Sequence, residues 1–124
     1  MLRLFVYGTL KKGFYNHGYL GKARLIGTAI LRGYDMYTNG GFPYITKGDG
    51  VVHGEVYEVT NEHDIKNIRM LESGYDETDV TIVFDGNSLE DEYEVSSTAK
   101  AYTFPEKRES DRWVRVDDGV FNLK

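Results

Sequence analysis

Only one segment of this chain has the pattern of an α-helix, so most of its other regular structure should be extended. In the segment Asn61–Glu72, the apolar residues Ile65, Ile68 and Leu71 recur at helical spacing. The other apolar runs are short, rich in β-branched and aromatic residues, and separated by glycine-containing turns. Six runs are predicted to be strands: Met1–Tyr7, Ala23–Tyr37, Phe42–Thr46, Val51–Thr60, Asp79–Phe84 and Tyr93–Phe104. Six or more strands with one main helix are typical of a small mixed β-barrel, closed or half closed, of the α+β class.

Glycine and proline predict where these strands are irregular. Gly27 and Gly33 interrupt the second run and predict bulges or bends. Pro43 suggests an edge, because proline cannot donate a ladder hydrogen bond. Three segments are expected outside the strands: a solvated hairpin through Asp85-Gly86-Asn87 and Glu90-Asp91-Glu92, a polar loop over Glu106–Arg112, and a short tail over Trp113–Leu123.

The composition argues against several classes of function. The 124 residues suffice for one domain spanning 1–124, with a core that needs no cross-links. The lack of cysteine removes disulfides and thiolate chemistry, and three scattered histidines, His17, His53 and His63, predict no metal centre. A net charge of −5 argues against nucleic-acid and anionic-membrane partners. The chain has no membrane-spanning run and no signal-peptide pattern, so it is expected to be soluble and cytoplasmic.

Glu72 is the acidic residue with the least expected position on the helix. With Ile65 placed at 0° and each residue advancing about 100°, Glu72 falls at about 340°, inside the apolar stripe. The other acids, Glu62 and Asp64, lie in the first turn, where the dipole favours them and Asn61 is a suitable N-cap. Burial and the negative end of the dipole should both raise the pKa of Glu72. A glutamate with a pKa of about 6–7 suits general acid–base chemistry at neutral pH.

The position of Glu72 also has a second interpretation. If the helix ends one residue earlier, Glu72 turns outward and becomes a surface acid at the helix C-terminus. Ser73-Gly74 follows at once and is a suitable C-cap, which keeps Glu72 at the margin of the helix. The spacing of residues leaves these two interpretations open.

A glycine turn, Tyr7-Gly8-Thr9-Leu10-Lys11-Lys12-Gly13, ends the first predicted strand. A strand that runs into Gly-Thr exposes successive backbone N–H groups, which form a concavity suited to a carboxylate or another small anion. The two glycines have the spacing of a phosphate-binding P-loop, but Phe14-Tyr15 stand where that motif needs Lys-Ser/Thr. The segment is therefore compatible with a plain tight turn or with an anion site.

Short blocks spread along the sequence form a specific combination. They are FVYGTLKKG at Phe5–Gly13, Asn16-His17, Phe42-Pro43, VHGEVYEV at Val52–Val59, and Leu71-Glu72 followed by Tyr75. In this order and at about this spacing they resemble the γ-glutamylcyclotransferase-like (AIG2-like) family, over nearly the whole chain. The closest resemblance is to γ-glutamylamine cyclotransferase-like members. It implies a small mixed β-barrel with few helices.

The resemblance also implies a site and a reaction. The loop Tyr7-Gly8-Thr9-Leu10 would line the pocket and offer backbone N–H groups to the α-carboxylate of a γ-glutamyl substrate, with Tyr75 also placed at the pocket. Glu72 would be the general acid/base. The α-amine of the substrate attacks its own γ-carbonyl, closes 5-oxoproline and expels an amine or amino acid. This lyase-class cyclotransferase chemistry needs no metal and no cofactor.

The sequence departs from the family at one place near the expected site. Members often follow the glutamate with Tyr-x-Arg, whereas this chain has Tyr75-Asp76-Glu77, after a shorter connection. This departure motivates an alternative, a non-catalytic small-anion-binding or interaction module on the same barrel. The leaving amine is predicted to contact variable loops such as Gly40–Gly50 and Ser88–Glu92. The sequence leaves the identity of the amine and the oligomeric state open.

Five other polar residues have both a structural and a functional interpretation. Glu55 alternates with apolar residues on its strand and is expected to make a structural hydrogen bond or to reach the pocket. His53 lacks the partners of a catalytic triad and is interpreted as structural, whereas His17 lies where it could reach substrate. Lys11 and Lys12 are expected to be solvated at the surface or to attract an anionic substrate at long range.

Overall fold

The computed structural model of the chain describes residues 1–85, 95–108 and 110–122. Its elements in chain order are β1 (Leu2–Val6), the short 3₁₀ helix η1 (His17–Leu20), β2 (Arg24–Thr38), β3 (Pro43–Val59), α1 (Glu62–Leu71), β4 (Asp76–Phe84), β5 (Val95–Thr103) and β6 (Val114–Arg115). The predicted hairpin residues Gly86-Asn87 and Glu90-Asp91-Glu92 lie outside the described residues. No helix within the described ranges has the length and apolar character needed to cross a membrane.

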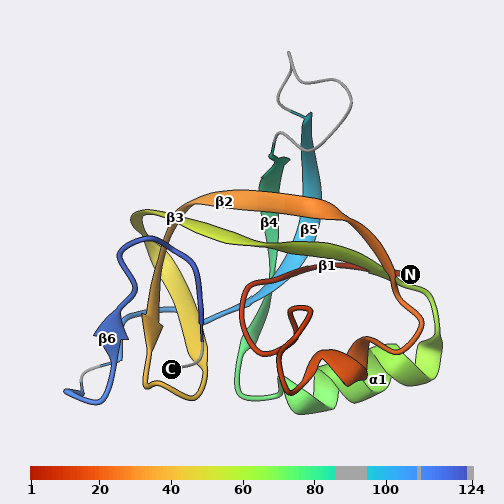
Figure 1. The fold of residues 1–124 in the computed structure, drawn as a ribbon, viewed down its shortest axis with the longest axis horizontal. Helices are drawn as coiled ribbons and strands as arrows, with labels where there is room; N and C mark the ends of the chain where they lie inside the picture. Colours follow the sequence, from red (N-terminus) through yellow and green to blue (C-terminus); the bar gives the residue numbers. More distant parts are fainter. Residues whose placement is uncertain (86–94, 109, 123–124) are drawn as a thin grey trace.

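The strands form a closed barrel of mixed direction (Figure 1). The order β3-β1-β5-β4-β2 closes on itself because β2 also pairs with β3, and β6 is an extra strand on β2. Strand β1 pairs with β5 in parallel, while the other pairings are antiparallel. Helix α1 lies beside η1, outside the barrel (Figure 1). The predicted α+β class, with a small mixed barrel and one main helix, is confirmed.

The sequence prediction for the second half of the β2–β3 hairpin was wrong. The runs at 42–46 and 51–60 were predicted as separate strands, but β3 is one strand of 17 residues. The glycines between the runs do not turn the chain. Gly48 and Gly50 lie against the Asp35 carboxyl group, where a Cβ would overlap the carboxylate, so glycine lets the strands approach each other here.

The predicted bulges in the second run are confirmed, whereas the predicted tail Trp113–Leu123 contains a short strand, β6. The register of β2 against β3 shifts at Leu25/Gly27 and at Arg32/Tyr34, so Gly27 and Gly33 lie at bulges. Pro43 does not mark an edge strand, because β3 has β1 and β2 as neighbours; it opens β3 opposite Thr38, at a strand start where the missing N–H is tolerated.

Strand β1 separates two apolar cores, which explains its continuous apolar sequence. Phe5 points into the barrel interior, where it packs with residues such as Ile45. Leu4 points the other way and packs with Ile65 and Ile68 of the helix. Burying side chains of this size contributes about 1.5–3 kcal/mol each, so the amphipathic helix is held mainly by this contact.

Candidate active site

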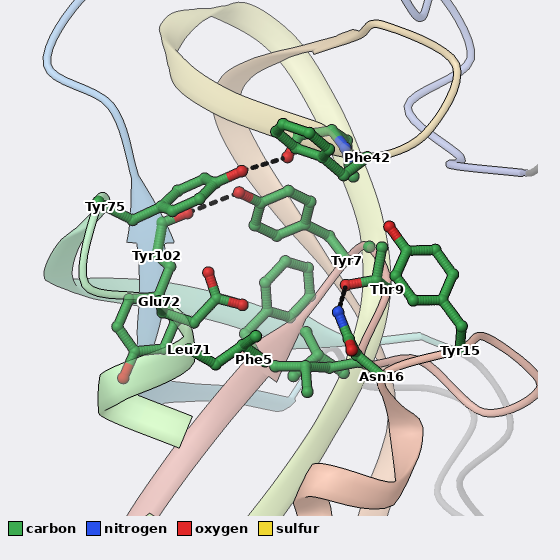
Figure 2. Close-up of a pocket in the computed structure, with 15 residues that line it drawn as sticks. Phe5, Tyr7, Thr9, Tyr15, Asn16, Phe42, Leu71, Glu72, Tyr75 and Tyr102 are labelled. Atoms are coloured by element: carbon green, nitrogen blue, oxygen red, sulfur yellow. Dashed lines mark hydrogen bonds between the residues drawn. The ribbon is translucent and has the colours of Figure 1, made fainter. Parts of the chain in front are cut away.

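Helix α1 ends at Leu71, and Glu72 is its C-cap. The helix therefore ends one residue early, as the surface-acid interpretation required, yet the carboxylate points into a pocket (Figure 2). The Glu72 N–H still donates to the Ile68 carbonyl at 3.0 Å, so the residue keeps the helical direction while its φ of −96° and ψ of 20° leave the helix. Gly74 does not have the positive φ of a left-handed C-cap. The turn is made instead by Tyr75, whose N–H donates to Glu72 O at 2.9 Å.

The electrostatic environment of Glu72 favours its protonated form. Burial raises the pKa of Glu72 from its usual 4.5 to about 7. Within the described ranges, no hydrogen bond or ion pair is made by its carboxylate. A carboxyl group that is half-buried, unpaired and near neutrality in pKa can both accept and donate a proton at physiological pH.

This raised pKa predicts a pH-dependent stability penalty. Below pH 4.5 the Glu72 carboxyl is protonated in both the folded and the unfolded chain, so its ionisation does not change the free energy of unfolding. As the pH rises towards 7 the unfolded chain ionises first, so the folded state loses stability. Glu72→Gln should therefore gain on the order of 2 kcal/mol relative to the parent between pH 5 and pH 8. Urea unfolding at both pH values measures this gain, with Glu62→Gln in the exposed first turn as the control. A stability difference that is constant with pH would contradict the raised pKa.

Gly8 is required because the chain approaches itself closely at this residue. A Cβ on Gly8 would lie 2.7 Å from Pro43 Cγ and 2.8 Å from Pro43 Cδ. The Pro43 carbonyl in turn accepts a hydrogen bond from the Tyr75 hydroxyl at 2.9 Å (Figure 2). Three blocks far apart in the sequence, around residues 8, 43 and 75, thus meet at one side of the pocket.

The loop after β1 has free backbone donors. Among the described residues, no acceptor is found for the backbone N–H groups of Gly8, Thr9 or Leu10. The loop is nevertheless fixed: Lys11 N–H donates to Gly8 O at 3.0 Å, and Asn16 donates from Nδ2 to Thr9 Oγ1 at 3.0 Å. A fixed turn with unpaired N–H groups is compatible with binding a carboxylate.

Glu72 and the glycine loop share a single pocket of about 340 Å³. All six residues predicted for the site line it: Tyr7, Gly8, Thr9, Leu10, Glu72 and Tyr75. Two further lining residues, Phe42 and Pro43, belong to the range Gly40–Gly50 that was predicted to contact the leaving amine. The other lining residues were not predicted from the sequence: Phe5, Val6, Tyr15, Asn16, Leu71, Gly74 and Tyr102. Some of these residues belong to the short sequence blocks that resemble the family. No local sequence pattern places Tyr15 or Tyr102 at the pocket, because their positions depend on the loop path and on strand pairing.

Tyrosines form one wall of the pocket and are held by hydrogen bonds. Tyr7 donates from its hydroxyl to the Tyr102 carbonyl at 2.6 Å (Figure 2). Burial, with smaller contributions from Tyr75 and Glu72, raises the pKa of Tyr7 well above its usual value. Tyr102 donates from its own hydroxyl to Glu77 Oε1 at 2.8 Å. These tyrosines are neutral donors at physiological pH.

The departure from the family pattern at Glu77 has a structural counterpart on the helix. Glu77 Oε1 lies 3.0 Å from Arg69 Nε, so an acid on β4 pairs with a base on α1. The Arg69 hydrogen bond holds the pKa of Glu77 below its usual value. The pair ties the last turn of the helix, which carries Glu72, to the start of β4.

The remaining polar candidates lie away from the pocket lining. Glu55 Oε1 accepts hydrogen bonds from Lys12 N–H at 2.9 Å and from the Tyr57 hydroxyl at 3.0 Å. These contacts agree with the interpretation of Glu55 as a structural residue. His17 donates from Nδ1 to the Leu10 carbonyl at 2.9 Å and supports the loop from outside the pocket. His53 is exposed and bonds through its backbone N–H to Gly119 O.

Lys11 corrects the expectation of surface lysines. It is only 9% exposed, and its Nζ donates to the Phe121 carbonyl at 3.0 Å. Burial lowers the pKa of Lys11, while Glu55 opposes the change. Lys11 thus anchors the C-terminal segment to the glycine loop, whereas Lys12 is exposed.

These features define a class of protein: a small closed mixed β-barrel whose tyrosine-lined pocket contains one perturbed carboxylate. The family described as "Gamma-glutamyl cyclotransferase, AIG2-like" matches residues 4–122. The chain belongs to this family.

Two relatives illustrate the sequence similarity. Escherichia coli K12 YtfP, a gamma-glutamylcyclotransferase family protein, is 38% identical over 60 residues, which cover 48% of this chain and 53% of YtfP. The match thus spans about half of that relative. A Vibrio cholerae protein, provisionally named a gamma-glutamylcyclotransferase, is 35% identical over 104 residues, covering 83% of this chain and 82% of its own.

Solved structures show the same barrel. An uncharacterized protein from Pyrococcus horikoshii superposes with a TM-score of 0.72 at 28% identity, covering 98% of this chain and 90% of its own. An AIG2-like protein from mouse gives a TM-score of 0.76 at 23% identity, covering 98% and 88%. The mouse protein therefore supports the fold alone.

Proposed function

We propose that this protein is a cyclotransferase that converts a γ-glutamyl-amine or γ-glutamyl-amino acid into 5-oxoproline and a free amine. The observation that carries the proposal is that Glu72, with a pKa of about 7, shares one pocket with the unpaired N–H groups of Gly8, Thr9 and Leu10. The names of its relatives support the coarser assignment to gamma-glutamylcyclotransferases. The pocket volume of about 340 Å³ suits a small-molecule substrate.

In this proposal the glycine loop binds the α-carboxylate of the substrate, and Glu72 moves the protons. The α-nitrogen, freed of one proton, attacks the γ-carbonyl carbon and forms the lactam C–N bond. The bond from that carbon to the leaving nitrogen then breaks. Two protons leave the α-nitrogen and two reach the leaving nitrogen, so one carboxylate that accepts and donates in turn balances the reaction.

One acid is sufficient because the nucleophile and the electrophile belong to one molecule. Well-oriented intramolecular reactions gain up to about 7–11 kcal/mol from proximity. A positioned general acid/base adds typically about 10²–10⁴-fold. The pocket must therefore bind the substrate in a bent conformation and hold one proton near Glu72. Tyr7 and Tyr75 would line the part of the pocket that contains the bent γ-glutamyl chain.

The alternative, a non-catalytic anion-binding module, would be favoured by a Glu72 carboxylate that faced solvent away from the Gly8-Thr9 turn. Figure 2 shows the carboxylate directed into the pocket instead, on the side of the Tyr7 and Phe5 rings. This geometry supports the enzyme over the module.

The proposal is tested by incubating the purified chain with a panel of γ-glutamyl-amino acids and γ-glutamyl-amines and measuring 5-oxoproline by mass spectrometry. We expect multiple turnovers with at least one member of the panel. The matching α-glutamyl compounds are the control, because their geometry does not allow closure of the same lactam by the free α-amine. A panel that gives no 5-oxoproline above the enzyme-free rate would refute the activity.

A further inference from the structure

A second hollow adjoins the pocket and was not assigned by sequence analysis. It is an open groove of about 860 Å³ between the 39–42 turn and the segment 104–113. Phe42 and Gly74 line both the groove and the pocket, so the two hollows meet there. The described lining of the groove contains three basic residues and one acid: Lys107, Arg108, Arg112 and Glu106. The groove thus combines contact with the proposed active site and an excess of positive charge along its described lining.

Arg108 is held in place within this groove. Its guanidinium carbon lies 4.8 Å from the centre of the Phe104 ring and 5.5 Å from that of Trp113. Its backbone N–H donates to the Tyr44 hydroxyl at 2.7 Å. In the part of the chain that the structure describes, no carboxylate pairs with the guanidinium. A stacked arginine without a counter-ion presents its N–H donors edge-on to a ligand.

Aromatic stacking connects Arg108 to the pocket. The Phe104 ring also packs against Tyr75, with centroids 4.7 Å apart, so Phe104 lies between a pocket residue and the guanidinium. Phe42, which lines both hollows, contacts Trp113 edge to face at 5.4 Å. Burial raises the pKa of Tyr75, and the positive charge of Arg108 opposes that rise, which places the charge within electrostatic reach of the pocket.

On the basis of the proposed cyclotransferase function, we propose that this groove is the leaving-group subsite and that Arg108 binds a carboxylate carried by the expelled amine. A γ-glutamyl unit in the pocket directs its leaving nitrogen towards the shared boundary at Phe42 and Gly74. An arginine binds a carboxylate through two parallel N–H···O bonds, which a simple alkylamine cannot form. The preferred substrates are then γ-glutamyl compounds whose leaving amine carries a carboxylate, rather than γ-glutamyl derivatives of simple alkylamines.

This subsite differs from the one predicted from sequence. The leaving amine was predicted to contact Gly40–Gly50 and Ser88–Glu92. Of the first loop, only Phe42 lines the groove, because most of that range is strand β3, and Ser88–Glu92 lies outside the described residues. The described residues of segment 104–113 supply most of the lining, and only Glu106–Arg112 within it was interpreted from sequence as a polar loop.

The test compares γ-glutamyl-alanine with γ-glutamyl-ethylamine, which differ only in the carboxylate of the leaving group. We expect the parent chain to have a kcat/KM at least about tenfold higher for γ-glutamyl-alanine, as a charged hydrogen-bonded contact allows. Arg108→Ala should lower that value by about 10–100-fold and leave γ-glutamyl-ethylamine within about twofold, which also shows that the variant is folded. Arg108→Lys should recover part of the loss. Lys66→Ala, which removes an exposed charge from α1, is the control.

A binding measurement distinguishes an incorrect subsite assignment from an incorrect cyclotransferase assignment. Trp113 is the only tryptophan of the chain, so its fluorescence reports on the groove. In the Glu72→Gln background, γ-glutamyl-alanine should change the emission saturably, with a Kd at least about tenfold weaker once Arg108 is also alanine. Equal turnover of the two substrates, or equal losses in Arg108→Ala, overturns the subsite and leaves the cyclotransferase intact. Turnover of other panel members but of neither of these two compounds, or a silent Trp113, also overturns the subsite. Absence of 5-oxoproline from the whole panel refutes the cyclotransferase.

Discussion

Glu72→Gln is expected to form 5-oxoproline at least about 100-fold more slowly than the parent chain, since general acid–base catalysis contributes about 10²–10⁴-fold. Glutamine has nearly the same shape as glutamate, so the pocket wall is kept while the titrating proton is lost. The loss should fall on kcat, with KM changed little, because Glu72 acts on the reacting nitrogens rather than on the rest of the substrate. Steady-state kinetics on the best γ-glutamyl substrate of the panel measures both constants.

The pH profile adds a second measure of the same role. The parent should show an inflection in kcat/KM near pH 7, which is the pKa that burial gives Glu72. The inflection should be absent from the residual activity of Glu72→Gln. Glu62→Gln, the same chemical change in the exposed first turn of the same helix, should behave as the parent. A Glu72→Gln enzyme within tenfold of the parent would remove Glu72 from the mechanism.

The sequence predicts the site through patterns that are local in the chain. Glu72 lies inside the apolar stripe of the helix and Gly8 ends a buried strand, and both patterns can be recognised without coordinates. The side on which Glu72 leaves the helix depends on the C-cap dihedral angles and on its N–H bond to Ile68, which helix periodicity does not specify. This is why the spacing left two interpretations open and the structure is needed to place the carboxylate.

Features that depend on contacts between distant segments were not predictable. The continuity of β3 through Gly48 and Gly50 depends on Asp35 of the neighbouring strand. The burial of Lys11 depends on Phe121, 110 positions away. The groove forms because segment 104–113 packs against the 39–42 turn. In each case the partner residue is set by how separate segments pack in the folded chain, and no local pattern in the sequence specifies it.

Gly119→Ala is expected to destabilise the fold by about 3–5 kcal/mol, from a backbone clash and a strained dihedral angle together. Gly119 has a φ of +69°, in the left-handed region. A Cβ there would overlap the Val51 carbonyl oxygen and lie 2.9 Å from the Val51 carbonyl carbon. Those atoms belong to β3, so relief requires the C-terminal segment or the barrel strand to move.

Gly40→Ala measures the dihedral strain without the backbone clash, so comparing it with Gly119→Ala separates the two contributions. Gly40 has a φ of +96° and open space around its Cα, so alanine there meets only the dihedral strain of about 1–2 kcal/mol. Urea unfolding of both variants and the parent gives the difference, provided the m-values agree. Equal losses in the two variants would show that the clash with Val51 is relieved without strain.

The Gly119 clash should also loosen the wall behind the glycine loop. Gly119 O accepts the His53 N–H at 2.8 Å, and two residues later Phe121 packs on Phe14 with ring centroids 5.5 Å apart and accepts the Lys11 Nζ bond. If the segment lifts, the His53 amide should lose hydrogen-exchange protection, and Lys11 should lose its buried acceptor. Gly40→Ala should leave that amide protected, because its strain lies in the 39–42 turn. Loss of His53 protection in Gly119→Ala alone would therefore locate the effect at the contact between the C-terminal segment and β3, which supports the glycine loop.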